Sequence, residues 1–289
     1  MAPMKIAIAS GKGGTGKTTL STNLAAALAH DGRRVQYLDC DVEEPNGHIF
    51  LKSRWDRTDD LTVGVPQVES DKCTGCGKCG QLCQFSAIVT VKGKALVFEQ
   101  LCHSCGGCMA ICPAGAIREV PRKIGVARYG GSSGIATGQG LLNIGAIQSP
   151  AVIRHLKKGM GDRGIVILDA PPGTSCPVIE AIRDCDFVLL VTEPTPFGLN
   201  DLELAVGMVR QLGIPFAVAV NRCDIGDDSV VKYCRNEGIS VLLEIPNDRQ
   251  IAEAYSRGEM MVQAMPKYRS LFLELFDDMI QCTRKKVCR

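Results

Sequence analysis

The apolar positions of this 289-residue chain fall into short continuous runs that are separated by longer amphipathic stretches. The short runs are rich in Ile, Val and Leu, which is typical of strands covered on both faces of a parallel sheet. They predict strands at Met4–Ser10, Val35–Asp41, Gly164–Ala170, Phe187–Thr192, Pro215–Asn221 and Val241–Pro246. The amphipathic stretches predict helices at Lys17–His30, Pro150–Lys158, Leu199–Leu212, Asp228–Asn236, Asp248–Arg257 and about Lys267–Ile280. This alternation predicts an α/β fold, a mostly parallel sheet flanked by helices.

The region from about Leu61 to Lys123 breaks the alternation. It is rich in Gly and Cys and holds only brief strand-like pieces, at Ala87–Val91 and Ala95–Phe98. It also repeats internally, because DKCTGCGKCGQLCQFSAI is echoed by QLCHSCGGCMAICPAGAI. We therefore predict a small α+β module, residues 61–123, inserted into a larger domain formed by residues 1–60 and 124–289.

Composition narrows the classes of protein to consider. The net charge is only +2 and aromatic residues are scarce, so nucleic acid is not an expected partner. The first ten residues lack the features of a secretory signal, and no apolar run approaches the length of a membrane span. We expect a cytoplasmic protein. In such a protein, fifteen cysteines favour metal ligation over disulfides.

A phosphate-binding loop follows the first predicted strand. The sequence GKGGTGKT satisfies G-x-x-x-x-G-K-[ST] and leads directly into a predicted helix. Its glycines let backbone N–H groups converge on phosphates, and the helix N-terminus adds its positive end. We expect Lys17 to reach the β- and γ-phosphates and the Thr18 hydroxyl to bind Mg²⁺. The predicted nucleotide-binding loop comprises Gly11, Lys12, Gly13, Gly14, Thr15, Gly16, Lys17, Thr18 and Thr19.

Lys12 is a second lysine inside the loop, and this KGGTGKTT form resembles the deviant Walker A family. The family includes the septum-site protein MinD, the chromosome-partition ParA proteins and the nitrogenase iron protein. The resemblance covers residues 1–50 and about 164–280. It implies that Lys12 reaches the phosphates of a partner subunit, so that ATP drives the formation of a homodimer.

The same resemblance assigns roles to residues at strand ends. In the arrangement DxDxxxxN, which ends at Asn46, Asp41 matches the carboxylate that orients the attacking water and accepts its proton. Asp39 is expected to support Mg²⁺ through water. IVILD resembles a Walker B strand, so Asp169 is expected to hold a Mg²⁺-bound water, and residues 170–174 (APPGT) resemble switch II.

The base of the nucleotide is expected at the other end of the site. Asn221 matches the family's base-binding asparagine, and Pro246 and Asp248 match the segment beside the adenine. The glycine-rich stretch Gly130–Gly145 is interpreted as either a flexible linker or a contact loop that moves with the nucleotide.

Eight cysteines form two runs of spacing C-x₂-C-x₂-C-x₃-C, and Pro113 follows the second run. This resembles the bacterial two-cluster ferredoxins, in which the fourth cysteine of each run binds the other cluster. The resemblance implies one [4Fe–4S] cluster held by Cys73, Cys76, Cys79 and Cys112, and a second held by Cys102, Cys105, Cys108 and Cys83. Zinc is the competing interpretation, although its C-x₂-C pairs usually stand a dozen or more residues apart. Gln84 departs from the ferredoxin pattern, which has proline there.

We assign structural roles, rather than ligand-binding roles, to five other cysteines and to the last predicted helix. Cys176 lies where the nitrogenase iron protein has a cluster ligand, but no cysteine between Lys123 and Asp169 could pair with it. We therefore predict buried small residues at Cys176, Cys40, Cys185, Cys223 and Cys234. The apolar face of Tyr268–Ile280 is predicted to pack in the core. A membrane-surface helix is the alternative, which acid on the polar face disfavours.

As a whole the chain resembles the MinD-superfamily ATPases that contain an inserted ferredoxin domain. The resemblance implies an ATP-hydrolysing iron–sulfur protein whose cofactors are ATP, Mg²⁺ and two [4Fe–4S] clusters. The leading hypothesis is an ATP-gated electron carrier that acts with an unidentified redox partner. The alternatives are an ATPase for iron–sulfur or metallocofactor assembly and a MinD- or ParA-like spatial regulator with redox-sensing clusters.

Overall fold

A nine-stranded sheet organises the computed structural model, which describes residues 2–285. The strand order is β11-β10-β9-β1-β8-β2-β7-β6-β3, and the seven strands from β11 to β7 run parallel. The six predicted strands are confirmed as β1 (Met4–Ala9), β2 (Val35–Asp39), β8 (Ile165–Asp169), β9 (Phe187–Thr192), β10 (Phe216–Asn221) and β11 (Val241–Ile245). The predicted α/β class with a mostly parallel sheet is therefore confirmed.

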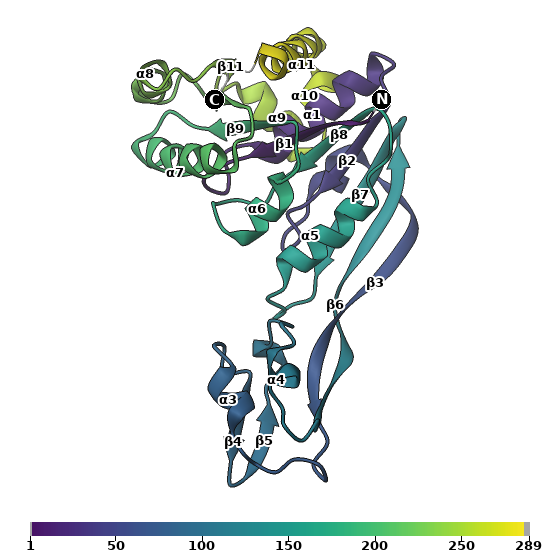
Figure 1. The fold of residues 1–289 in the computed structure, drawn as a ribbon. Coiled ribbons are helices and arrows are strands. Elements are labelled where there is room, and N and C mark those ends of the chain that lie inside the picture. The colour runs from purple at the N-terminus through teal and green to yellow at the C-terminus, as the bar shows by residue number, and fades with distance from the viewer. Residues whose placement is uncertain (1, 286–289) are drawn as a thin grey trace.

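Helices cover both faces of this sheet (Figure 1). One apolar core forms against α5 (Ser149–Lys158), α6 (Cys176–Ile182), α7 (Pro196–Leu212) and α8 (Ser229–Asn236). A second core forms on the opposite face against α1 (Lys17–His30), α9 (Arg249–Ser256), α10 (Met261–Ala264) and α11 (Lys267–Lys285). The strands between these layers are buried on both sides, which is why their sequences are apolar almost throughout.

The last helix packs in the second core, as predicted. Phe272, Leu275, Phe276 and Met279 of α11 are all at most 4% exposed. Within residues 2–285, no helix is both long enough and apolar enough to cross a membrane.

Two long antiparallel strands extend from the edge of the sheet. β3 (Arg54–Val68) follows the short helix α2 (Gly47–Leu51) and pairs with β6 (Ile117–Ser132), which turns back into β7 (Ile135–Leu142). The pairing runs through positions 61 and 123, and its register shifts between Leu61 and Thr62. Below we call this pair of strands the β3–β6 ribbon.

The glycine-rich stretch 130–145 is neither a linker nor a loop along most of its length, so that interpretation was wrong. It contains the end of β6, a tight turn and the whole of β7. A Cβ on Gly138 would lie 2.6 Å from Leu38 Cδ2, and one on Gly140 would lie 2.6 Å from Val42 Cγ1. These glycines let β7 approach the residues of β2 and the segment after it, so they serve close packing rather than flexibility.

The far end of the β3–β6 ribbon carries residues 69–116, which we call the cysteine-rich segment (Figure 1). Its elements are α3 (Lys78–Leu82), β4 (Ile88–Val91), β5 (Lys94–Val97), the 3₁₀ turn Glu99–Leu101 and α4 (Gly107–Ala110). The two strand-like pieces expected from sequence form the antiparallel pair β4–β5. The internal repeat appears as two similar short helices, because Gly77 and Gly106 precede α3 and α4 with φ of 78° and 71°.

Candidate functional site

The phosphate-binding loop connects β1 to α1 and is held against two other strand ends. Gly16 precedes α1 in a left-handed conformation, with φ of 96°. A Cβ there would meet the Nδ2 atom of Asn221 at 2.5 Å, so only glycine fits without displacing this side chain. Asn221 Nδ2 donates to the Thr15 carbonyl at 2.9 Å. Gly11 is equally constrained, because its Cβ would lie 2.2 Å from the Asp201 carbonyl oxygen in α7.

A cavity of about 410 Å³ opens beside this loop at the carboxyl ends of the strands. The predicted site residues that line it are Gly13, Gly14, Gly16, Lys17, Thr18, Thr19, Asp41, Asn221, Pro246 and Asp248. The predicted residues Gly11, Lys12, Thr15, Asp39 and Asp169 are not among its lining residues. Residues predicted for the phosphate end and residues predicted for the base end therefore line one cavity, and the roles expected for them stay predictions.

Lys12 contributes its backbone to the loop. Its carbonyl oxygen accepts from the Ser10 hydroxyl and, at 3.5 Å, from Lys17 Nζ. This hydrogen bond keeps the Lys17 ammonium group close to the backbone of the loop. The role expected for the Lys12 side chain concerns a partner subunit, so it stays a prediction.

Two buried carboxylates lie beneath the cavity on neighbouring strands. Asp39 and Asp169 pair in register across β2 and β8 and are 2% and 1% exposed. Asp39 Oδ2 accepts from the Gly47 amide at 2.9 Å and Oδ1 from the Asp41 amide at 3.2 Å, so Asp39 fixes the turn that leads to α2. Burial, with the neighbouring Asp169 charge, raises the pKa of Asp39 well above its usual value. Two adjacent carboxylates in this position favour a nearby cation.

Asp169 has one satisfied and one unsatisfied oxygen. The Tyr37 hydroxyl donates to Oδ2 at 2.8 Å, whereas Oδ1 is buried without a hydrogen-bond partner. Burial raises the pKa of Asp169, and the nearby hydroxyl groups of Thr18, first, and Tyr37 oppose this. An unpartnered carboxylate oxygen close to the Thr18 hydroxyl fits a divalent cation or a water bound to one.

Tyr37 contacts the candidate site through Asp169 and was not predicted from the sequence. Its strand is buried apart from Gln36, and a tyrosine in such a strand is usually a core residue. Its partner Asp169 is 132 residues further along the chain. Only the parallel pairing of β2 with β8 brings the two together, and no local pattern contains that pairing.

Asp41 and Lys17 face each other across the phosphate end of the cavity. Burial, followed by the nearby Asp169 charge, raises the pKa of Asp41 to about 6, while Lys17 opposes the shift. Burial lowers the pKa of Lys17, which Asp169 and Asp41 partly offset. A carboxylate with a pKa close to neutral can accept a proton from an attacking water.

The opposite end of the cavity is formed by β10, β11 and α9. Asp248 caps α9, because its Oδ1 accepts from the Gln250 amide at 2.8 Å. Arg222 and Tyr255 also line this end and were not predicted. The Arg222 guanidinium bonds to Glu193 Oε1 at 3.1 Å, and the Tyr255 ring lies 4.8 Å from that of Phe50. Two features of the sequence could have indicated them. Arg222 directly follows the predicted base-binding Asn221, and Tyr255 lies near the end of α9.

The eight cysteines of the two runs gather around two separate hollows in the cysteine-rich segment. A hollow of about 20 Å³ is lined by Cys73, Cys76, Cys79 and Cys112. Another of about 90 Å³ is lined by Cys83, Cys102, Cys105 and Cys108. We call these the first and second cysteine sets. Each set takes three cysteines from one repeat and one from the other, so the two repeats interlock.

Thiols in these sets receive backbone donors. The Ser104 amide donates to Cys102 Sγ and the Ala116 amide to Cys112 Sγ, both at 3.3 Å. A hydrogen bond from the Lys78 amide is the main cause that lowers the pKa of the Cys76 thiol. Among residues 2–285, no three His, Cys, Asp or Glu side chains converge tightly enough to hold a single metal ion. Four thiols around a hollow with amide donors fit the corners of a larger iron–sulfur group.

The prediction that Cys176 is buried was wrong, because its side chain is exposed. Cys176 begins α6, whose buried side is formed by Val178, Ala181 and Ile182 further along the helix. Cys40, Cys185 and Cys234 are buried as predicted, and Cys223 is only partly buried.

Comparisons with known proteins agree with this geometry. The profile of the CobQ/CobB/MinD/ParA nucleotide binding domain matches residues 6–262. Two uncharacterized proteins of Methanocaldococcus jannaschii are 30% and 31% identical to the chain over 90% and 95% of its length, covering 92% and 95% of their own. An iron–sulfur cluster carrier protein of Pyrococcus horikoshii is 26% identical over 96% of the chain and 85% of its own length.

Solved structures share the fold. The cell division ATPase MinD of Pyrococcus furiosus has a TM-score of 0.60 at 20% identity, covering 96% of this chain and 98% of its own. The septum site-determining protein MinD of Pyrococcus horikoshii, complexed with Mg-ADP, has a TM-score of 0.57 at 22% identity, with coverage of 96% and 95%. At these identities the likeness concerns the fold alone.

Proposed function

The chain belongs to the CobQ/CobB/MinD/ParA nucleotide-binding family, and from that premise we propose an ATPase whose nucleotide-dependent dimer controls electron transfer through two [4Fe–4S] clusters. One observation carries the proposal. A phosphate-loop cavity with acidic residues beside it and two interlocked sets of four cysteines occur on the same chain. The first is suited to a nucleotide and the second to resident redox groups.

In the proposed nucleotide site, the loop amides, Lys17 and Thr18 bind the phosphates and Mg²⁺ of ATP. Asp169 holds a Mg²⁺-bound water through its unpartnered Oδ1, and Asp39 supports the same cation. Asp41 takes the proton of the attacking water, since its pKa of about 6 leaves it charged at neutral pH. Asn221, Pro246 and Asp248 hold the adenine end of the cavity.

Lys12 is proposed to act between subunits. Its side chain does not line the cavity of its own chain, which leaves it available to a second copy. In the Lys12→Ala variant we expect ATP binding to persist and ATP-dependent dimerisation to disappear, as measured by sedimentation with a non-hydrolysable ATP analogue. A variant that dimerises like the wild type would contradict this role. Lys17→Ala, which removes ATP binding itself, provides the contrasting control.

The cysteine-rich segment, within the proposed module 61–123, is assigned to electron transfer. Each proposed ligand set combines both repeats, so release of a cluster requires the two repeats to separate. This interlocking favours a resident cofactor over a transferable one. Bound clusters would supply one-electron chemistry, and the protein supplies the thiolates, the amide donors and the apolar surroundings that adjust their potentials.

A protein partner is expected at the cysteine-rich segment, because large apolar side chains are exposed there. They are Leu82, Phe85, Val91, Leu96, Phe98, Leu101, Met109 and Ile111, each between 41% and 48% exposed. Exposed apolar groups gathered on one part of a surface often mark interaction sites.

A second candidate function is delivery of iron–sulfur clusters to other proteins. The observation that favours it is that several relatives at 24–26% identity are iron–sulfur cluster carrier proteins. Cluster delivery predicts that the chain loses clusters to an acceptor protein, whereas electron transfer predicts that it keeps them.

The two functions separate in one anaerobic experiment. Chain loaded with clusters and chemically reduced is mixed with an oxidised c-type cytochrome, or with a cluster-free ferredoxin, with and without MgATP. The proposal expects cytochrome reduction at an ATP-dependent rate and unchanged iron content of the chain. Movement of iron to the ferredoxin would favour delivery, and cytochrome reduction at equal rates in both nucleotide states would contradict control by ATP.

A further inference from the structure

The helix α5 reaches the cysteine-rich segment at its N-terminal end (Figure 1). Gln148, the residue that precedes α5, donates from Nε2 to the Cys102 carbonyl at 2.6 Å. Gln148 is only 7% exposed and its Oε1 accepts from the Ile147 amide at 3.1 Å, so the amide group is held on both sides. A residue of the larger α/β part therefore binds the backbone of the second cysteine set directly.

The same end of α5 is tied to the residues that follow Asp41. The Ser149 hydroxyl donates to Glu43 Oε1 at 2.8 Å. The Val42 carbonyl accepts from the Leu142 amide at 2.8 Å, at the start of the loop that leads to Gln148. A displacement of residues 41–43 must therefore displace both ends of the 142–149 loop or break these bonds.

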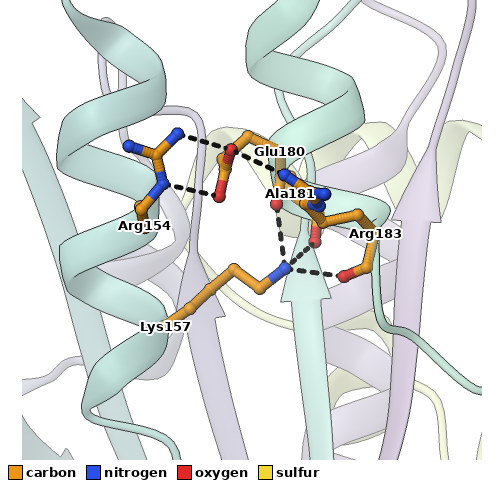
Figure 2. Close-up of polar contacts among 5 residues, drawn as sticks. All are labelled: Arg154, Lys157, Glu180, Ala181 and Arg183. Atoms are coloured by element: carbon orange, nitrogen blue, oxygen red, sulfur yellow. Dashed lines mark hydrogen bonds and ion pairs between the residues drawn. The ribbon is translucent and has the colours of Figure 1, made fainter.

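The body of α5 is tied to α6, which follows the loop after Asp169. Figure 2 shows Arg154 of α5 paired with the Glu180 carboxylate through two hydrogen bonds of 3.2 and 2.9 Å. Lys157 Nζ donates to the carbonyls of Glu180, Ala181 and Arg183 at 2.8, 3.3 and 2.7 Å. The buried face of α5, with Val152 and Leu156, packs in the core shared with α6. The two helices are therefore packed together as one unit.

We propose that α5 couples the nucleotide site to the second cysteine set, with Gln148 as the positioning residue that acts on the Cys102 peptide. The inference deepens the proposed function and rests on its placement of ATP beside Asp41 and Asp169. A shift of α5 changes the orientation of the peptide that follows Cys102. The Ser104 amide, two residues on, donates to Cys102 Sγ. Amide donors to cysteine sulfurs are among the groups that set the potential of iron–sulfur clusters.

The coupling has a reciprocal form. If ATP changes the reduction equilibrium of the second set by some factor, reduction must change the affinity for ATP by the same factor. This equality does not depend on which partner receives the electron. It can therefore be measured on the isolated chain.

Amide hydrogen exchange on the cluster-loaded full-length chain tests the coupling. We compare exchange of residues 101–109 in the presence of ADP and of a non-hydrolysable ATP analogue, for the wild type and for Gln148→Leu. The wild type should show a difference of about five-fold between nucleotides, the factor contributed by one net hydrogen bond to a local opening. In Gln148→Leu the difference should vanish while iron content stays unchanged, and by linkage the ratio of the affinities for the analogue and for ADP should change by no more than about the same five-fold factor. Gln81→Leu, an exposed amide on the same segment, should keep the difference.

A role of Gln148 in stability alone would lower protection equally with both nucleotides, leaving the difference intact, and that result would overturn the proposal. An absent difference in the wild type would overturn it as well.

If Gln148→Leu does not load with clusters, Ser149→Ala replaces it, since this change lies outside the cysteine-rich segment and removes only the bond to Glu43. Loss of the difference in Ser149→Ala supports the proposal, and its persistence counts against it. If the chain reduced no acceptor, the proposed electron-transfer function would be refuted. The hydrogen-exchange measurement would still test the coupling through α5.

Discussion

At the scale of single residues, the site depends on acidic groups whose charge state is set by burial. Asp41 is the clearest case, because its pKa of about 6 lies between the ordinary carboxylate value and neutrality. Its role requires the charged form, which is present above the folded pKa and is lost as pH falls through it. We expect kcat/KM for ATP hydrolysis to rise with pH along a one-proton limb centred near 6.

Asp41→Asn tests the same group. It should lower kcat on the order of 10²-fold, the usual contribution of a general base, and remove the ascending limb. The pKa of Asp41 is higher in the folded, nucleotide-free protein than in the unfolded chain. Stability of the fold is therefore lost as pH rises from the unfolded pKa through about 6. The variant should therefore unfold at a higher temperature than the wild type at pH 8, with no gain at pH 4. A wild-type pH profile in Asp41→Asn would rule out this assignment.

Tyr37 offers a second prediction at this scale. Tyr37→Phe removes the donor to Asp169 Oδ2 and leaves a second buried oxygen without a protein partner. We expect a loss of about 1–3 kcal/mol in the free energy of unfolding by urea titration without nucleotide. Added MgATP should recover part of the loss if a cation binds at Asp169. Tyr233→Phe, on the partly buried side of α8, is the matched control and should change stability little.

At the scale of elements, the glycines of β7 explain why one strand escaped sequence prediction. Gly138→Ala should destabilise the fold by about 1–3 kcal/mol, because the new Cβ overlaps Leu38 Cδ2. In contrast, a Cβ on Gly207 in α7 meets nothing within 4 Å, so Gly207→Ala should stabilise by about 0.5–1 kcal/mol. Thermal unfolding of the two variants decides whether β7 is tightly packed. Equal stability of both would contradict the close approach.

Elements that are specified by their own local pattern were predicted, and elements that depend on pairing with a distant segment were not. Strands such as β1 and β9 were predicted because burial on both faces makes them apolar almost throughout. β3 was missed because it has charged residues at Arg54, Asp56 and Arg57 and pairs with a strand some fifty residues or more away across the cysteine-rich segment. The resemblance to two-cluster ferredoxins implied the crossed cysteine sets, whereas the contact between Gln148 and Cys102 depends on tertiary packing that no periodicity encodes.

At the scale of the whole molecule, the interlocked repeats predict an unusual pattern of cluster loss. Cys83→Ser lies in the first repeat but lines the hollow of the second set, while Cys112→Ser lies in the second repeat and lines the hollow of the first. We expect each variant to perturb the EPR signal of the set formed mainly by the other repeat. If each instead perturbed its own repeat, the crossed assignment would be wrong.

The β3–β6 ribbon has a consequence for how such a chain could arise. Val68 and Ile117 are paired across the ribbon, so the cysteine-rich segment leaves and rejoins it at adjacent positions, about 5 Å apart. Without that segment, the two strands would need only a short turn to remain a hairpin at the edge of the sheet. One in-frame insertion at a hairpin tip is therefore sufficient to give a nucleotide-binding ancestor its cysteines, without rearranging a single strand of the parallel sheet.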